Sequence, residues 1–236
     1  MIVASIFGTK GIAHISIIPL HAILVNMEPV RVVKNSIDNE EAEFIINYIN
    51  KNQEFFSTGP KRLRFQKMFG NDKFHKGQSA KIITGIDEIQ NKIEAIINLS
   101  VKSISDEFKD NEQLYLSSLW LAKQVSGAQV RGHLDTDSGA NDHYEYSAIL
   151  YLNTPNDSGP LEFPYLSLEI MPMSGDLVIF KSAENTSFHE VKFINEDRYS
   201  VLLWFTKDKN YELKFGENRG RKPSYESDDS LSVIVP

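Results

Sequence analysis

The sequence predicts an α+β fold in which helices come first along the chain and short β-strands follow. Before residue 109, two segments carry apolar residues at spacings of three and four, which is typical of amphipathic helices. After residue 144, short runs of β-branched, aromatic and aliphatic residues are bounded by Gly, Pro, Asn, Asp or Ser, which is typical of strands. The chain of 236 residues is long enough for one domain with a substantial core.

The first predicted helix follows Ser36-Ile37-Asp38, whose side-chain oxygens can cap its first turn. A second helix is predicted near residues 87–108, and we expect both helices to pack against the outside of the strands. The apolar face of the first comprises Ala42, Phe44, Ile45, Tyr48 and Ile49, and that of the second comprises Ile89, Ile93, Ile96, Ile97 and Ile104. Between the helices, the basic run 61–67 predicts a solvated loop or an edge strand, with a substrate groove as the alternative.

Strands are predicted over residues 145–153, 176–181 and 198–206. We divide the chain into an N-terminal extension (1–26), a helical and loop-containing flanking region (27–112), a β-core that belongs to the same domain (113–209) and a polar C-terminal tail (210–236). Met27 looks like the natural start of the fold. We expect poor order in the tail, because it is polar and rich in charged residues.

Two imidazoles and one carboxylate stand in a pattern that is typical of a metal centre. His133 and Asp135 are one residue apart, so an extended segment would project both side chains to the same side, and His189 would arrive from a distant strand. Two histidines and one carboxylate hold non-haem Fe(II) while leaving positions open for a co-substrate and oxygen. Three ligands imply catalysis, because closed structural sites normally use four, usually with thiolates, and this chain has no cysteine.

Further motifs surround these residues between Gln124 and Phe205. They are Gly127, six residues before His133; Tyr151-Leu152-Asn153; Gly159 with Glu162-Phe163-Pro164; Pro172 with Gly175-Asp176-Leu177-Val178-Ile179-Phe180; His189-Glu190-Val191; and Arg198-Tyr199-Ser200-Val201-Leu202-Leu203-Trp204. In this order they resemble the prolyl 4-hydroxylase-like branch of the Fe(II)/2-oxoglutarate-dependent oxygenases. The resemblance implies a double-stranded β-helix, or jelly-roll barrel, that brings distant strands together around one cavity.

The resemblance also implies the cofactors. Fe(II) would be held by His133, Asp135 and His189, with 2-oxoglutarate and O2 as co-substrates and ascorbate as a further candidate cofactor. The implied reaction hydroxylates an unactivated carbon and releases succinate and carbon dioxide. The substrate would be a peptide, a protein or an amino acid, with peptidyl proline as the first candidate.

Arg198 is the second-strongest signal in the sequence. It opens an apolar strand, so its guanidinium would face the barrel interior, where an unpaired charge is very costly. The far carboxylate of 2-oxoglutarate would pair with it in a bidentate fashion. By the resemblance, Tyr151 would add its hydroxyl to the same carboxylate, and Gln124 stands where many relatives place a tyrosine beside the co-substrate. The alternative is a surface pair between Arg198 and the neighbouring Asp197 or Glu196.

Three positions bear on the substrate. Tyr144 stands where prolyl hydroxylases commonly carry an arginine that contacts the peptide, which leaves the iron chemistry intact and puts the substrate in doubt. Trp204 stands where relatives often have a large aromatic residue near the metal, although a tryptophan in an apolar strand is otherwise ordinary core. His143 directly precedes a predicted strand, so the mouth of the site is one of its two possible locations and a solvated loop is the other.

Other functions remain as alternatives. A non-catalytic jelly-roll binding module would be expected to lose a ligand or the arginine, and an oxygenase acting on a free amino acid or small molecule would keep them all. A halogenating relative would normally lack the carboxylate ligand, so Asp135 favours hydroxylation. A nucleic-acid dealkylase typically has a second arginine six residues after the first, where this chain has Trp204.

Composition restricts the partners. The net charge is −7 and the isoelectric point is near 5.4, which argues against unaided binding of nucleic-acid phosphates. Residues 1–26 contain no apolar run of the length that a membrane span needs, and they lack a basic segment before an unbroken apolar stretch. The absence of cysteine is compatible with a reducing compartment. We therefore expect a cytoplasmic protein with neither nucleic-acid nor membrane partners.

Overall fold

The computed structural model describes residues 29–51, 65–67, 81–83, 88–136, 139, 141–156 and 159–215. Our predictions for the N-terminal extension, for the first part of the basic run and for the end of the C-terminal tail lie outside the described residues. Within the described ranges, the helices are α2 (Asn39–Lys51) and α3 (Gln90–Phe108), with short 3-10 helices η2 (Pro164–Leu166), η3 (Asn185–Ser187) and η4 (Lys209–Tyr211). None of the described helices is both long and apolar enough to span a membrane.

The strands of the described chain are β1 (Val30–Val33), β2 (Phe65–Lys67), β3 (Lys81–Ile83), β4 (Tyr115–Gln124), β5 (Val130–His133), β6 (Tyr146–Tyr151), β7 (Leu161–Phe163), β8 (Leu168–Ile170), β9 (Leu177–Lys181), β10 (His189–Val191), β11 (Arg198–Thr206) and β12 (Leu213–Phe215). The three strands predicted in the second half correspond to β6, β9 and β11, with boundaries that agree within about two residues. Strand β4, with 10 residues, was not predicted, and the other described strands have only three or four residues.

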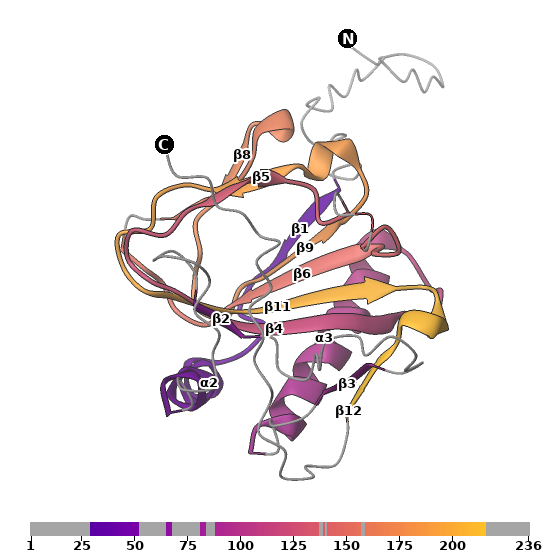
Figure 1. The fold of residues 1–236 in the computed structure, drawn as a ribbon, viewed down its shortest axis with the longest axis horizontal. Helices are drawn as coiled ribbons and strands as arrows, with labels where there is room; N and C mark the ends of the chain where they lie inside the picture. Colours follow the sequence, from indigo (N-terminus) through magenta and orange to yellow (C-terminus); the bar gives the residue numbers. More distant parts are fainter. Residues whose placement is uncertain are drawn as a thin grey trace, which may run out of the picture.

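Among the described residues, the strands form a larger sheet in the order β1-β9-β6-β11-β4-β2, a smaller sheet in the order β5-β10-β7-β8, and the pair β12-β3. All pairs within the two sheets are antiparallel, and neighbouring strands are often distant in sequence. Figure 1 shows the helices below the larger sheet and the smaller sheet above it. This arrangement is the double-stranded β-helix that the resemblance implied.

The larger sheet has two buried faces because successive side chains of a strand point to opposite sides. Leu150 of β6 and Val201 of β11 pair in register and belong to the core cluster shared with the helices. Ile149, Tyr151 and Val178 belong to a second cluster, which includes residues of the smaller sheet. A one-residue slip of β6 would exchange the two faces, so burial on both sides fixes its register.

The helices pack as expected, with one exception. Asp38 caps α2 by accepting a hydrogen bond from the Glu41 backbone N–H at 2.8 Å. Ile45 and Ile49 are fully buried against the larger sheet. Phe44, which we placed on the same apolar face, is 48% exposed, so this prediction is wrong. Phe44 lies at the edge of the buried stripe, where spacing alone does not decide between core and solvent.

The fully buried Ile93 of α3 provides a test of the helix–sheet core. We expect Ile93→Ala to lower the free energy of unfolding by about 2–5 kcal/mol, because the truncation leaves a cavity in a packed interior. The matched control is Phe44→Ala on α2, which should change that free energy by no more than about 0.5 kcal/mol. Both values can be measured by urea unfolding, and equal values would contradict the packing described.

Two segments extend the fold beyond the β-core that we delimited. Strand β2 pairs with β4 at the edge of the larger sheet, which confirms an edge strand for residues 65–67 of the basic run. Strand β12 pairs in parallel with β3, and it lies inside the segment that we assigned to the polar tail. Ordered structure therefore continues to Phe215. The paired strands are far apart in the sequence, so no local sequence pattern predicts which strands pair.

Candidate metal centre

His133 and His189 face each other across two neighbouring strands. The antiparallel pairing of β5 with β10 places them directly opposite in register, and their ring centroids are 4.4 Å apart. The Nδ1 atom of His133 lies 2.8 Å from the carbonyl oxygen of Arg131, and that of His189 lies 2.9 Å from the carbonyl oxygen of Ser187. An Nδ1–H that donates to a carbonyl fixes the ring and leaves Nε2 of each histidine available as a ligand atom.

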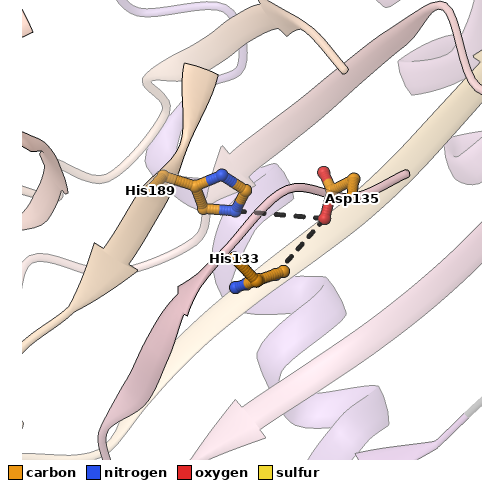
Figure 2. Close-up of side chains that lie close together, drawn as sticks. All are labelled: His133, Asp135 and His189. Carbon is orange, nitrogen blue, oxygen red and sulfur yellow. Dashed lines mark ion pairs between the residues drawn. The ribbon is translucent and has the colours of Figure 1, made fainter. Parts of the chain in front are cut away.

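Asp135 completes the group from a turn. Strand β5 ends at His133, so our expectation of one extended segment carrying both residues is wrong in detail. The turn nevertheless brings the Asp135 Oδ1 atom to 3.4 Å from His133 Nε2 and 3.9 Å from His189 Nε2. Figure 2 shows both histidines directed at this one oxygen. Across the described residues, these three form the group whose ligand atoms could hold a metal ion, all within 4.8 Å of one another.

The electrostatics favour an ionised Asp135. Burial alone would raise the pKa of this carboxyl group, but it is outweighed by the hydrogen bond with His133, by the charges of His189 and His133, and by a hydrogen bond from Ser147. Together these contacts lower the pKa of Asp135 from 3.8 to about 2. An anionic carboxylate between two imidazoles is suited to a divalent cation, because it supplies negative charge that neutral histidines lack.

This lowered pKa predicts a pH dependence of the metal-free protein. Ionised Asp135 contributes stability that is present above its ordinary pKa and is lost as the pH falls toward 2. The contribution corresponds to about 2 kcal/mol. We expect the free energy of unfolding of the wild type to exceed that of Asp135→Asn near neutral pH, and the difference to shrink between about pH 4 and pH 2. Urea titrations with a chelator present would measure it, and a constant difference would contradict the assignment.

Arg198 is a buried residue at the start of β11. Its side chain is only 4% exposed, and burial lowers its pKa. Its Nε–H donates to the Gln124 side-chain oxygen at 2.7 Å, and its Nη1–H donates to the Gly159 carbonyl at 2.8 Å. Gly159 has a φ of +66°, and a Cβ there would lie 2.8 Å from Ile194, so only glycine fits this approach. Neutral oxygens orient the guanidinium but leave its charge uncompensated.

The surface alternative for Arg198 is not observed. Asp197 pairs with Lys123 at 3.0 Å and accepts from the Ser126 backbone, while Glu196 binds Asn156. In the part of the chain that the structure describes, no ion pair joins Arg198 to a carboxylate.

Tyr151 marks where an anion would fit. Its ring lies under the Arg198 guanidinium, with 5.6 Å between the guanidinium carbon and the ring centroid. Its hydroxyl is fully buried and has no hydrogen-bond partner among the described residues. A buried hydroxyl without a partner costs about 1–3 kcal/mol. A buried cation beside an unsatisfied hydroxyl matches the charge and hydrogen-bonding needs of a carboxylate.

The three substrate candidates form one aromatic group. The Tyr144 ring stacks on Trp204, with centroids 5.9 Å apart, and burial raises the pKa of Tyr144 to about 12. Trp204 pairs in register with Ser147, whose hydroxyl contacts Asp135, so this wall lies beside the metal centre. His143 stacks on Tyr211 at 3.7 Å and does not join the metal group.

Sequence reasoning missed the polar residues that support these side chains. The Ser147 and Ser182 hydroxyls lie 2.8 Å apart, and Ser147 donates to Asp135. A signal was present, because Ser147 alternates with Ile149 and Tyr151 on one face of a predicted strand. A polar residue on a buried face needs a partner.

Comparisons with known proteins agree with this fold. Residues 119–206 match the model of the 2OG-Fe(II) oxygenase superfamily. No curated protein matches the sequence. A viral collagen prolyl hydroxylase from Paramecium Bursaria Chlorella virus-1, in its 2OG complex, has a TM-score of 0.60 at 16% identity, covering 79% of this chain and 99% of that chain.

Two further prolyl hydroxylases have similar folds. The Pseudomonas putida prolyl-4-hydroxylase gives a TM-score of 0.54 at 20% identity, over 78% of this chain and 95% of that chain. The Trichoplax adhaerens prolyl hydroxylase, in complex with a peptide fragment of the hypoxia inducible factor oxygen degradation domain, gives 0.57 at 19% identity, over 80% and 88%. At these identities the likeness concerns the fold.

Proposed function

Since residues 119–206 match the model of the 2OG-Fe(II) oxygenase superfamily, we propose that the protein hydroxylates an amino-acid side chain of a peptide at an unactivated carbon, releasing succinate and carbon dioxide. Peptidyl proline is the first candidate substrate, supported by the similar folds of prolyl hydroxylases. The observation that carries the proposal is the convergence of His133, Asp135 and His189 on one point.

The three converging side chains are the proposed ligands of Fe(II). When bound, the iron would allow O2 to oxidise 2-oxoglutarate and an unactivated C–H bond, which no amino-acid side chain can do alone. The protein's contribution is to hold the donors in place. The carbonyls of Arg131 and Ser187 orient the imidazoles, and the ionised Asp135 partly neutralises the cation.

Arg198 and Tyr151 are the proposed anchor of the far carboxylate of 2-oxoglutarate. The buried guanidinium would donate in a bidentate fashion, and the Tyr151 hydroxyl would gain the partner that it otherwise lacks. Gln124 acts on the guanidinium, since its side-chain oxygen accepts from Arg198 Nε and so directs the remaining N–H groups. Ile149 of the second core cluster lies between Ser147 and Tyr151 on the same face of β6.

A succinate-release assay tests the proposal. Iron-loaded protein would be supplied with 2-oxoglutarate and O2, together with either a panel of proline-rich peptides or free amino acids. We expect peptide-stimulated succinate formation, with hydroxylated peptide detected by mass spectrometry. If only free amino acids stimulate succinate formation, the substrate is a small molecule and not a peptide. Absence of succinate from folded, iron-loaded protein would reject the enzyme and favour a binding module.

Tyr144 is the first position to test for substrate choice. We expect Tyr144→Ala to raise the KM for the peptide by about 10-fold or more, because truncation removes a stacked ring from the wall beside the metal centre. The requirement for 2-oxoglutarate should stay unchanged, since Tyr144 is not among the contacts of Arg198 or Tyr151. Steady-state kinetics with each reactant varied separately would measure both values. A rise in the 2-oxoglutarate requirement alone would contradict this role.

A further inference from the structure

We propose that Ser147, supported by Ser182, is a positioning residue that makes Asp135 a ligand through one oxygen only. The inference rests on the proposed function, because it assigns a role at the same metal centre. It concerns how the protein keeps coordination positions open.

The two oxygens of Asp135 have different surroundings. Oδ1 is the atom that lies 3.4 Å and 3.9 Å from the Nε2 atoms of His133 and His189. Oδ2 instead accepts a hydrogen bond from the Ser147 hydroxyl at 2.5 Å. A short hydrogen bond to an ionised acceptor is among the stronger ones in proteins. The carboxylate is thus held with one oxygen toward the imidazoles and the other toward β6.

Ser147 is itself fixed in place. It is 2% exposed on β6, between Trp204 of β11 and Phe180 of β9 in the register of the sheet. Its hydroxyl lies 2.8 Å from that of Ser182, which is 1% exposed and whose backbone N–H donates to the Glu145 carbonyl at 2.9 Å. Both hydroxyls therefore belong to buried residues, Ser147 on β6 and Ser182 directly after the end of β9.

The direction of the hydrogen bonds follows from the contact with Asp135. The Ser147 hydroxyl donates its single proton to Oδ2. Ser147 then has only acceptor capacity left, and Ser182 donates to it. The two hydrogen bonds therefore run from Ser182 to Ser147 and from Ser147 to Asp135. The first hydrogen bond strengthens the second.

This arrangement has a consequence for coordination. Three protein ligands that each bind through a single atom would leave positions open on the iron for the 2-oxo acid and O2. If Asp135 rotated and bound through both oxygens, it would take one of those positions. Ser147 opposes that rotation, because Oδ2 would have to give up the hydrogen bond that it accepts from the buried Ser147 hydroxyl.

Cobalt(II) bound in place of iron provides a direct readout, because its visible d–d absorption reports the ligand arrangement without turnover. We expect Ser147→Ala to bind Co(II) with an altered spectrum and to bind 2-oxoglutarate about 10- to 100-fold more weakly than the wild type. Ser147→Thr retains the hydroxyl and should restore both properties. Ser182→Ala should give a smaller change in the same direction.

The outcomes separate this inference from the proposed function. A wild-type Co(II) protein that binds no 2-oxoglutarate would count against the function, while the spectra of the variants would still decide the role of Ser147. A Ser147→Ala spectrum and 2-oxoglutarate affinity equal to those of the wild type would overturn the inference. Thermal unfolding of each variant reports its folding, and if Ser147→Ala does not fold, Ser147→Thr and Ser182→Ala carry the test.

Discussion

The Asp135→Ala variant is expected to form neither hydroxylated product nor succinate while keeping its fold. Asp135 is the anionic member of the proposed ligand set, so its removal should weaken Fe(II) binding by more than the roughly 10- to 100-fold that loss of a supporting residue costs. The fold should persist because Asp135 lies in a turn and belongs to neither hydrophobic cluster. The Asp135 carboxylate would fill a coordination position that a halide could occupy, and its removal would open that position.

The measurement is anaerobic at first. Wild-type protein with Fe(II) and 2-oxoglutarate should develop a weak visible charge-transfer absorption, which bleaches with formation of succinate when oxygen is admitted. Asp135→Ala should show neither. The matched control is Asp142→Ala, because the Asp142 side chain is 74% exposed and outside the metal group. Succinate formation by Asp135→Ala at the wild-type rate would refute the ligand assignment.

Arg198→Ala is expected to raise the 2-oxoglutarate requirement steeply while leaving Fe(II) binding unchanged. The variant would lose the proposed charge-assisted, bidentate contact with the co-substrate, worth about 2–4 kcal/mol, or about 30- to 1000-fold in affinity. Arg198→Lys keeps the positive charge but loses the planar guanidinium, so its 2-oxoglutarate requirement should lie between those of the wild type and Arg198→Ala.

The control for Arg198 is Arg131→Ala, since Arg131 is exposed on β5 and only its backbone carbonyl contacts His133. Titration of 2-oxoglutarate against succinate formation gives the requirement, and a separate metal titration gives iron affinity. An unchanged 2-oxoglutarate requirement in Arg198→Ala would assign the anchor to another cation. A parallel loss of iron affinity would instead indicate a structural role.

The sequence was sufficient for features that depend on local pattern. Strand β11 was predicted at its observed bounds, and the five residues proposed for iron and 2-oxoglutarate were named from their spacing and the resemblance. Such features are readable because strand alternation and short motif spacings are local properties. Phe44 shows the limit even there, because the depth of a helix in the core depends on what packs beside it.

Features that depend on register could not be read. The direct opposition of His133 and His189, the approach of the Gly159 carbonyl to Arg198, and the pairing of β12 with β3 all join residues far apart in the chain. The alternation of Ser147 with Ile149 and Tyr151 indicates a polar residue on a buried face, but the partner of Ser147, Asp135, is set by the fold. Hydrogen-bond partners of this kind are set by the pairing and packing of the sheets and not by neighbouring residues.

The pairing of β5 with β10 links metal binding to strand alignment. The register is irregular between His189 and Val191, directly beside the metal group. A slip by one residue would bring Glu190 opposite His133 and turn the His189 ring to the other face of the sheet. An ion that binds only the aligned form stabilises it by about 2.7 kcal/mol at a hundredfold excess over its dissociation constant. A cation bound by both histidines would thus hold the two short strands in register. Hydrogen exchange of the backbone amides of β5 and β10 should therefore slow when the metal binds.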